Sequence, residues 1–332
     1  MLVMAVENKI LVSVCCAVYN QVQFVRQTLD GIVSQKTNFK FEVLVNDDGS
    51  TDGTTDIIKE YEEKYSDLIK PIYHSENQYS KGISVNYVNN FNRVRGKYIA
   101  LCEGDDYWID DGKLQMQVDF LENNPDYSLA YTDYKTYFQK DGSFRPNNFW
   151  RDNFLHPTFR LHLIHTMYLA PCSWLFRTVD LPQIPSDAVD GTYRIMLFFL
   201  ATKKVKYIDK VTCVYRVLGE SASHTPTLKK KYNFLRGLIK TQDECMALYD
   251  AKVELVTEVH YHMYNRIFKL AVAIGDFQFI KLMREFWSKN KCRNTSDRVY
   301  YFLSYFSHIL YPFFNFAYNI KTSIKQMFGV RD

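Results

Sequence analysis

Three apolar runs end in short clusters that carry the side chains best suited to chemistry. They are Ala-Val-Tyr-Asn at residues 17–20, a polar stretch at residues 46–52, and Glu-Gly-Asp-Asp at residues 103–106. Ligands of open α/β sheets bind beyond the carboxyl ends of the strands. If the apolar runs are neighbouring strands of one parallel sheet, the three clusters lie along one edge of it and form a single site.

The carboxylates of the third cluster predict a divalent cation. Mg²⁺ and Mn²⁺ prefer hard oxygen ligands, keep several waters and bridge to phosphate oxygens, so one or two protein carboxylates are enough to hold them. Asp105 and Asp106 are the predicted ligands. The cation would offset the concentrated charge of a nucleoside diphosphate leaving group in a chain without a large basic patch. A solvated acidic turn is the alternative, and the preceding apolar run counts against it.

The first two clusters predict recognition of a base. The ring of Tyr19 can stack on a uracil-like ring, while the carboxylate of Asp48 accepts the imide proton of that ring. A turn followed by a helix cap is the alternative for residues 46–52, and both interpretations can hold together.

Composition excludes several classes of protein. The chain of 332 residues has 41 Lys and Arg against 37 Asp and Glu, so it lacks the basic surplus of a nucleic-acid-binding protein. Its seven cysteines show no paired or metal-binding spacing, which favours a reducing compartment. The first ten residues lack the basic start and apolar stretch of a secretory signal. These features predict a cytoplasmic globular protein.

The elements that must position the clusters follow an α/β pattern. Apolar runs of strand length at residues 10–18, 41–47, 70–74 and 98–103 alternate with helical periodicity at residues 24–34 and 54–65. Such alternation predicts a mostly parallel sheet flanked by helices. Further signals continue to residue 217: strands at residues 128–138 and 173–177, a helix at 193–201 and a strand pair at 205–217, with an irregular stretch through residue 157. We therefore expect a catalytic domain at residues 1–225 and a helical extension at residues 226–332.

The end of the extension has an unusual composition. Residues 299–320 contain no Asp, Glu, Lys or Arg and are rich in Tyr and Phe. Several polar residues and Pro312 interrupt the stretch, so it is a poor candidate for a membrane span of about 20 apolar residues. Two interpretations stand side by side: a segment from about residue 299 that lies peripherally on the inner face of a membrane, or a helical hairpin that packs on the protein.

These segments together resemble the family 2 glycosyltransferases, which have the GT-A fold. SVCCAVYN at residues 13–20 is similar to the opening strand of that family, and VNDDGSTDGT at residues 45–54 is similar to its second motif. GKYIALCEGDDYW at residues 96–108 resembles the segment that ends in the Asp-x-Asp motif, with Glu103 in the first acidic place. That departure leaves open which of Asp105 and Asp106 contacts the metal. The likeness covers roughly residues 8–225.

The resemblance implies further site residues. SENQYSKG at residues 75–82, with Asn86, is similar to the segment that approaches the ribose and diphosphate, and VYRV at residues 214–217 closes the acceptor-side half. Asp190 is by this likeness the catalytic base, and a helix cap is the alternative for that residue. Arg216 and His224 could touch the diphosphate or the acceptor, but a paired surface arginine and an ordinary loop histidine are expected. The implied nucleotide-binding residues are Ala17, Tyr19, Asn20, Asp48, Lys81, Asn86 and Asp105.

The predicted function is an inverting, metal-dependent transfer in polysaccharide biosynthesis. A hexosyl or N-acetylhexosaminyl group would pass from a nucleotide diphosphate sugar, UDP-linked, to a hydroxyl of a glycan or of a lipid-linked saccharide, with Mn²⁺ or Mg²⁺ bound. Asp190 would take the proton of the attacking hydroxyl. Because Glu103 departs from the motif, a non-catalytic nucleotide- or carbohydrate-binding subunit is the alternative. A nucleotidyltransferase is disfavoured because no Gly-rich loop follows the first strand.

Overall fold

The computed structural model describes residues 9–83, 89–145, 156–166, 169–185, 190–219, 227–290, 292 and 294–327, with side chains up to residue 318. The chain divides into two compact units. The first contains most of the chain up to Val217, and the second contains the chain from Leu218 together with two short earlier segments. Each unit is described by itself.

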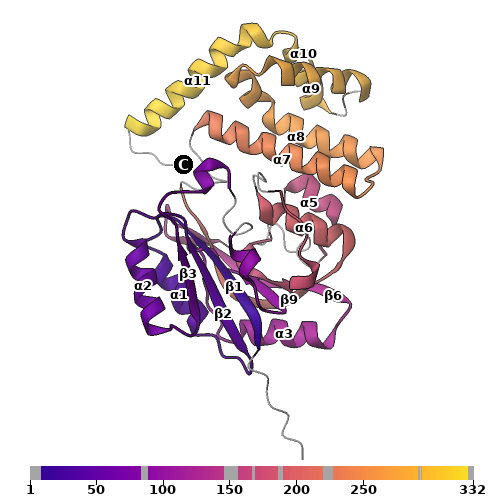
Figure 1. The fold of residues 1–332 in the computed structure, drawn as a ribbon. Helices are drawn as coiled ribbons and strands as arrows, with labels where there is room; N and C mark the ends of the chain where they lie inside the picture. The colour runs from indigo at the N-terminus through magenta and orange to yellow at the C-terminus, as the bar shows by residue number, and fades with distance from the viewer. Residues whose placement is uncertain are drawn as a thin grey trace, which may run out of the picture. The chain divides into compact units, whose positions relative to one another are not determined.

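The first unit is built on one mixed sheet, which has nine strands in the described part of the chain (Figure 1). The strand order is β3-β2-β1-β4-β8-β6-β9-β5, and β7 pairs with β6. The first four strands in this order are parallel, whereas β8 runs antiparallel to both of its neighbours. The strands are β1 (Ile10–Val18), β2 (Lys40–Asp47), β3 (Ile69–Tyr73), β4 (Tyr98–Leu101), β5 (Tyr107–Trp108), β6 (Tyr127–Phe138), β7 (Ser143–Arg145), β8 (Trp174–Arg177) and β9 (Lys204–Val217).

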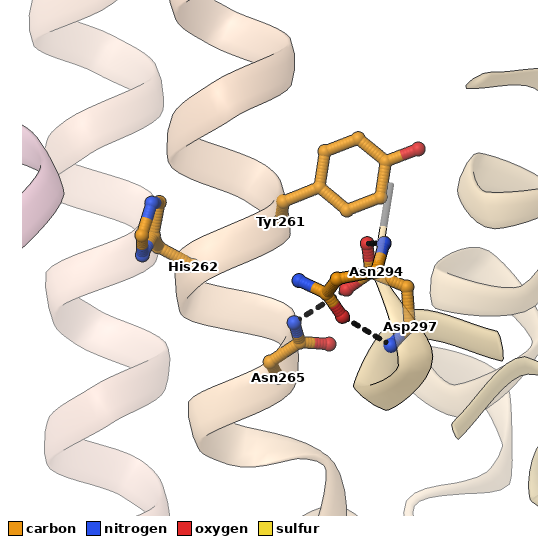
Figure 2. Close-up of a pocket in the computed structure, with 5 residues that line it drawn as sticks. All are labelled: Tyr261, His262, Asn265, Asn294 and Asp297. Carbon is orange, nitrogen blue, oxygen red and sulfur yellow. Dashed lines mark hydrogen bonds between the residues drawn. The ribbon is translucent and has the colours of Figure 1, made fainter. Parts of the chain in front are cut away.

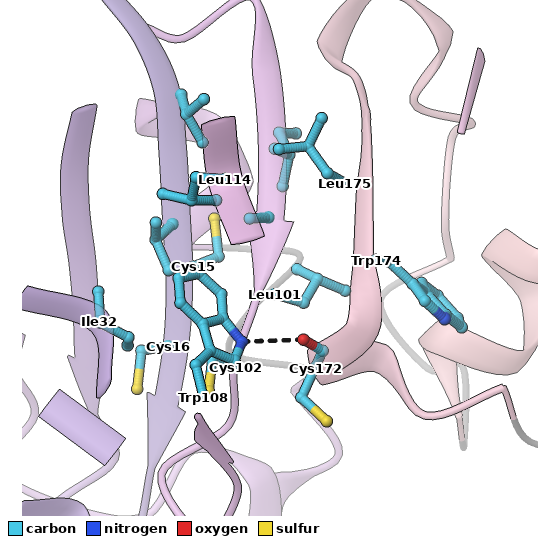
Figure 3. Close-up of a cluster of buried hydrophobic side chains, with 14 of the residues drawn as sticks. Cys15, Cys16, Ile32, Leu101, Cys102, Trp108, Leu114, Cys172, Trp174 and Leu175 are labelled. Carbon is cyan, nitrogen blue, oxygen red and sulfur yellow. Dashed lines mark hydrogen bonds between the residues drawn. The ribbon is translucent and has the colours of Figure 1, made fainter. Parts of the chain in front are cut away.

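The core of this unit explains the continuous apolar runs of the sequence. All four residues of β4 and most of β1 are buried, as expected for central strands of a sheet that is covered on both faces. Trp108 lies in this core and its indole Nε1 donates to the carbonyl of Cys172 at 2.8 Å (Figure 3). The helices of this unit are α1 (Val25–Val33), α2 (Thr54–Lys64), α3 (Lys113–Asn123) and α6 (Gly191–Thr202).

The predicted elements of this unit are confirmed with two corrections. The expected strand pair at residues 205–217 is one long strand, β9, whose register against β6 shifts near Thr132 and Asp133. A local irregularity in one strand imitates a turn in the sequence pattern. The stretch expected to be irregular through residue 157 contains a short strand, β7.

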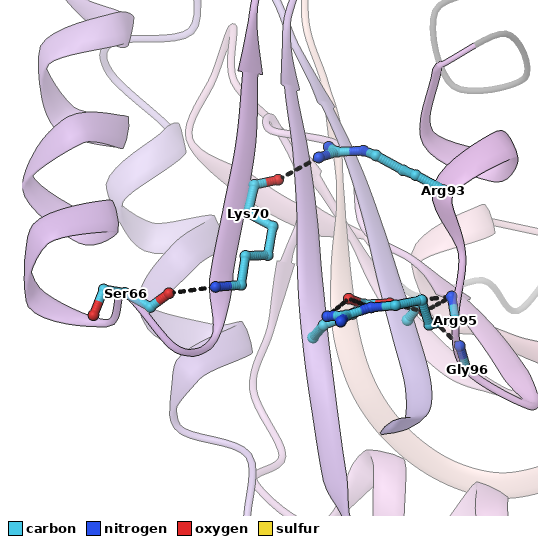
Figure 4. Close-up of polar contacts among 7 residues, drawn as sticks. Ser66, Lys70, Arg93, Arg95 and Gly96 are labelled. Atoms are coloured by element: carbon cyan, nitrogen blue, oxygen red, sulfur yellow. Dashed lines mark hydrogen bonds and ion pairs between the residues drawn. The ribbon is translucent and has the colours of Figure 1, made fainter. Parts of the chain in front are cut away.

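An ion pair between the exposed Arg95 and the buried Glu42 fixes the amino-terminal ends of the central strands. Glu42 is 1% exposed and accepts from the Arg95 guanidinium at 2.8 Å and from the Ser13 hydroxyl at 2.6 Å. The backbone N–H of Gly96 donates to the same hydroxyl at 3.0 Å, and the Arg93 guanidinium donates to the carbonyl of Lys70 (Figure 4). A buried carboxylate is tolerated because its partners satisfy it. The network ties β1, β2 and the entry of β4 together.

The described part of the second unit is largely helical, and its helices from residue 228 onward confirm the predicted helical extension. They are α5 (Phe159–His165), α7 (Leu228–Leu248), α8 (Val253–Ile274), α9 (Phe277–Asn290), α10 (Thr295–Ser304) and α11 (Ser307–Met327). Gly275 ends α8 with φ of 81°, a left-handed conformation that glycine adopts without strain. Among the described helices, none is long and apolar enough to cross a bilayer.

A small pocket of about 100 Å³ lies within the second unit (Figure 2). Asn294 and Asp297 form a capping box at the start of α10, and the Asn265 amide of α8 donates to the Asp297 carboxylate at 2.6 Å. These contacts hold α10 against α8 and stabilise the helix start. The polar groups of the pocket therefore have a structural role, and none of them belongs to the clusters singled out in the sequence.

Candidate active site

The register of the sheet brings the three polar clusters to one edge. Val18 at the end of β1 pairs with Asp47 at the end of β2, and Cys15 of β1 pairs with Leu101 at the end of β4. Backbone hydrogen bonds continue past the strands, from the Gly104 N–H to the carbonyl of Ala17 at 3.0 Å and from the Asp48 N–H to the carbonyl of Val18 at 2.9 Å. The expected common edge is confirmed.

The turns after β1 and β2 support each other. Asn20 has φ of 50°; its backbone N–H donates to the Ser50 hydroxyl at 3.0 Å and its side-chain oxygen accepts from the Thr51 N–H at 2.8 Å. Asp52 accepts from the N–H groups of Val22 and Thr54, so the predicted turn is present, whereas α2 begins after Gly53 without a side-chain cap. Tyr19 lies in the turn after β1, and 43% of its surface is exposed. Its ring is open to solvent, as a stacking face requires.

Asp48 is held in a closed arrangement. It is 1% exposed, and its two carboxylate oxygens accept from the backbone N–H groups of Gln78 at 2.7 Å and Tyr79 at 3.0 Å. A side chain at Gly49 would lie 2.7 Å from the backbone of Glu76. The segment that begins at Glu76 therefore packs directly against the turn after β2. Lys81 is exposed and pairs with Glu76 of the same segment. Asn86 lies outside the described residues.

The acidic loop after β4 packs tightly against residues from the end of β1 and from α1. A side chain at Gly104 would lie 2.3 Å from the Gln21 amide oxygen and 2.9 Å from a Val18 methyl carbon, so Gln21 and Val18 would have to move to admit one. The Thr28 hydroxyl of α1 lies 2.9 Å from the carbonyl oxygen of Gly104 and 2.6 Å from that of Asp106. Glu103 and Asp105 remain half-buried.

Arg216 of β9 holds this loop from the other side. It is 6% exposed, and its guanidinium donates to the carbonyl oxygen of Asp105 and, at 2.5 Å, to Gln27. The guanidinium carbon lies 4.7 and 4.8 Å from the ring centres of Phe24 and Tyr107. The prediction of a paired surface arginine is therefore wrong. No pattern in the sequence signals that this arginine is buried, because much of β9 is exposed or only half-buried.

Asp106, one of the two predicted metal ligands, contributes to the same arrangement. It is 2% exposed, and its Oδ1 accepts from the backbone N–H of Arg216 at 2.8 Å. This bond joins the acidic loop to β9. The more accessible carboxylates of the loop are those of Glu103 and Asp105.

Asp190 caps α6. Its Oδ1 accepts from the Tyr193 N–H at 2.9 Å and from the Thr192 hydroxyl at 2.8 Å. The helix cap, the alternative raised for this residue, is confirmed. It does not exclude a second role, because a carboxylate has further acceptor positions. His224, expected in a loop, lies outside the described residues.

Asp190 and the carboxylates of the acidic loop influence one another's pKa values. Burial raises the pKa of Glu103 to about 8, and the charges of Asp105 and Asp190 add to this rise. Burial likewise raises the pKa of Asp105 and of Asp190. The pKa of Tyr79, a residue that the sequence did not single out, is raised by burial and by Asp190 and Glu103. These four residues therefore share one environment of excess negative charge.

This donor set fits a divalent cation that is shared with a ligand. Among the described residues, no three His, Cys, Asp or Glu side chains form a complete metal site. Repelling carboxylates at a half-buried edge favour a cation, and a cation with one or two protein carboxylates takes its other ligands from phosphate oxygens and water. The residues present are consistent with that mode of binding.

Comparison with known proteins agrees with this architecture. The family described as Glycosyl transferase family 2 matches residues 13–182. Protein Rv1520 of Mycobacterium tuberculosis, which is uncharacterized, is 38% identical over 223 residues, covering 66% of this chain and 62% of the relative. The glucosyltransferase WfaP of Escherichia coli, named for UDP-Glc and a diphosphoundecaprenol-linked GlcNAc acceptor, is 33% identical over 131 residues, 40% of this chain and 48% of WfaP.

Two groups of solved structures share the fold. TarS of S. aureus, in complex with UDP-GlcNAc, aligns with a TM-score of 0.56 and 15% identity over 90% of this chain and 91% of the TarS chain. The mannosyltransferase PcManGT of Pyrobaculum calidifontis, in complex with GDP-Man and Mn²⁺, aligns with a TM-score of 0.53 and 15% identity over 96% of this chain and 87% of its own. The sheet, the motifs at its carboxyl edge and the family match over half of the chain agree: the chain belongs to glycosyl transferase family 2 and has the GT-A fold.

Proposed function

We propose that the protein is an inverting glycosyltransferase that transfers a hexosyl or N-acetylhexosaminyl group from a UDP-linked donor to a hydroxyl of a glycan or lipid-linked acceptor in polysaccharide synthesis. The observation that carries this proposal is the common electrostatic environment of Glu103, Asp105 and Asp190 at the carboxyl edge of the sheet. A leaving diphosphate needs a cation at this edge, and an acceptor hydroxyl needs a base.

The donor half of the proposal rests on the turns after β1 and β2. The exposed ring of Tyr19 offers a stacking face for uracil, Ala17 and Asn20 lie next to it in the sequence, and Lys81 lies on the segment that binds Asp48. Asp48 is 1% exposed, so it can accept the imide proton of the base once the segment that carries Gln78 and Tyr79 moves aside. Binding of the nucleotide thus rearranges the segment that carries Tyr79. The UDP-linked donors named for WfaP and TarS support this choice of donor class.

The cation, Mn²⁺ or Mg²⁺, is assigned to the acidic loop. Asp105 is half-buried and serves as the direct ligand, whereas Asp106, the second predicted ligand, keeps Arg216 and the loop in position. When bound, the cation offsets the negative charge of the diphosphate. The Mn²⁺ present in PcManGT supports a divalent cation in this fold.

Asp190 is assigned the role of the base. Burial raises its pKa, which strengthens it as a proton acceptor, and the cap contacts of Oδ1 fix the orientation of the carboxylate. The carboxylate takes the proton from the acceptor hydroxyl as that oxygen attacks the anomeric carbon. Attack opposite the departing diphosphate inverts the anomeric centre, and no covalent enzyme intermediate forms.

A turnover assay beside calorimetry tests this function. The protein is incubated with UDP-sugars, Mn²⁺ and lipid-linked or oligosaccharide acceptors, and UDP release is measured. Asp190→Asn should lower turnover by about 100-fold or more while UDP binding is kept. Asparagine is also a good helix cap, so the variant should stay folded.

Asp276→Asn is the matched control. Asp276 caps α9 through the N–H of Phe279 at 2.9 Å and accepts a hydroxyl proton from Tyr232, the same pattern as at Asp190. This variant should keep full turnover. Normal turnover by Asp190→Asn would refute the base assignment. UDP binding without transfer or hydrolysis of any donor would instead favour the non-catalytic subunit.

A further inference from the structure

The helices at the end of the chain expose large apolar side chains. In α10, Val299 is 46% and Phe302 62% exposed; in α11, Ile309 is 66%, Phe313 69% and Phe316 67% exposed. Tyr305 and Phe306 between the helices are 55% and 42% exposed. Single exposed apolar residues are ordinary, but a contiguous set marks a surface that another phase or partner covers.

The spacing of these residues places them on one side of their helices. Along α11, Ile309, Phe313 and Phe316 follow one another at intervals of four and three residues, which is the spacing of one helix face. Phe302 of α10 contacts Phe306, with ring centres 5.1 Å apart, so the apolar surface continues across the bend. We call this surface, formed by residues 299, 302, 306, 309, 313 and 316, the aromatic face.

The opposite side of α11 already has its partners within the second unit. His308 stacks on Phe277 of α9, with ring centres 3.8 Å apart. The Asn315 amide donates to the carbonyl of Ala273 in α8 at 2.9 Å, and the ring of Tyr311 lies against Gly275. The helix therefore packs on the unit through its more polar side. Packing on the protein, the second alternative raised for this segment, accounts for this side and leaves the aromatic face uncovered.

The charge of this region identifies what would cover that face. Residues 281–331 contain nine Lys and Arg but only two Asp and Glu, although the whole chain has a net charge of +4. One of the two acids, Asp297, is fully buried at the start of α10. The remainder of the chain is thus slightly acidic, and the basic surplus lies in the part of the sequence that contains and borders α10 and α11. Basic residues beside exposed Phe and Tyr match an anionic bilayer surface.

We propose that the aromatic face of α10 and α11 inserts into the interface of an anionic lipid bilayer, with the flanking basic residues on the headgroups. Aromatic side chains favour the boundary between headgroups and acyl chains. Since no described helix can span a bilayer, the face lies in the plane of the membrane. The inference does not depend on the proposed transferase activity.

Flotation of the full-length protein with vesicles tests this surface. The protein is mixed with vesicles of phosphatidylcholine alone or of phosphatidylcholine with phosphatidylglycerol, and the bound fraction is measured at low and high salt. Binding should require phosphatidylglycerol and should weaken with salt. Changing Ile309, Phe313 and Phe316 together to Ser should lower the affinity for the mixed vesicles by about tenfold or more, with unchanged thermal stability.

The matched control changes two equally exposed apolar residues of the same unit that lie outside the aromatic face. Leu248 and Val253 are 62% and 75% exposed next to the turn between α7 and α8. The double variant Leu248→Ser with Val253→Ser should bind the mixed vesicles like the wild type.

Equal losses in the triple variant and the control would overturn the proposal, as would absence of binding by the wild type. Sedimentation velocity in the absence of lipid distinguishes a second copy as the occupant. If the wild type self-associates and the triple variant does not, while neither binds vesicles, the face is a protein interface and the proposal is wrong.

Discussion

At the residue scale, the least expected feature is the position of Arg216. Its guanidinium is buried between two aromatic rings and donates to the carbonyl of Asp105, and its backbone N–H donates to Asp106. One residue thereby fixes both the path of the acidic loop and one of its carboxylates. We infer that Arg216 positions the loop for the cation and does not itself contact substrate.

Substitution of Arg216 by lysine tests this positioning role. Lysine keeps the charge but lacks the planar fork that reaches Asp105 and Gln27 together. Arg216→Lys should lower the free energy of unfolding by about 3 kcal/mol and weaken Mn²⁺-dependent UDP binding. Urea denaturation and calorimetry measure the two effects. If UDP affinity stays normal despite the loss of stability, Arg216 serves the fold alone.

The contacts of Asp48 lead to a second prediction at this scale. The amide protons of Gln78 and Tyr79 are bound by a carboxylate that is 1% exposed, so both should exchange slowly with solvent in the free protein. Addition of UDP with Mn²⁺ should speed the exchange of at least one of them, whereas neighbouring site residues become protected. Hydrogen exchange followed by mass spectrometry or NMR measures this. Slower exchange at both amides would show that the base binds without displacing the segment.

At the element scale, the start of α3 places a lysine inside the core. Lys113 is fully buried, donates to Gln117 at 2.7 Å and lies 4.4 Å from the ring centre of Trp108. Burial lowers its pKa from 10.5 to about 8. The strand that carries Trp108 begins directly after the acidic loop, so this buried charge lies next to the elements that support the site.

The lowered pKa of Lys113 predicts a pH dependence of stability. Between about pH 8 and 10.5 the unfolded chain holds this proton and the folded chain does not, so the free energy of unfolding should rise with pH, by at most about 3 kcal/mol. Lys113→Met removes the titrating group and should lack this rise. The difference between wild type and variant, measured by urea denaturation across this range, should therefore increase with pH. If the free energies of unfolding of the wild type and of the variant change in parallel with pH, the pKa of Lys113 is not lowered.

At the scale of the whole molecule, the two units differ in how they are held together. The first unit is held together by a sheet and by hydrogen bonds of buried polar residues such as Glu42 and Arg216. In the second unit the helices pack through aromatic contacts such as that of Phe268 with Trp287. Neither relies on disulfides, since all seven cysteines are free. Six of them are buried and Cys292 is half-buried.

Thiol labelling tests this description across both units. In the native protein a polar thiol reagent should modify one cysteine, Cys292, and in denaturant it should modify all seven. A reducing agent should leave the melting temperature unchanged, because it has no disulfide to break. Rapid labelling of more than one thiol in the native state would contradict the burial of the strand cysteines.

The sequence by itself determined the elements and the edge of the sheet at which the site lies. Continuous apolar runs predict buried strands, and the polar residues that end them must meet at one edge because parallel strands share a direction. The acidic loop followed from its position after an apolar run, the resemblance to the family added Asp190, and the roles of Asp190, Asp105 and Asp106 in chemistry stay predictions.

Only the tertiary structure decided how these side chains are used. Three features depend on residues that are 30 or more apart in sequence: the closure of Asp48 by the Gln78 segment, the burial of Arg216, and the shared electrostatic environment of Glu103 and Asp190. Local propensity cannot encode such contacts, because burial and charge proximity arise only when distant elements pack. The same reason explains the aromatic face: its composition is visible in the sequence, but which side of α11 remains uncovered depends on its packing against α8 and α9.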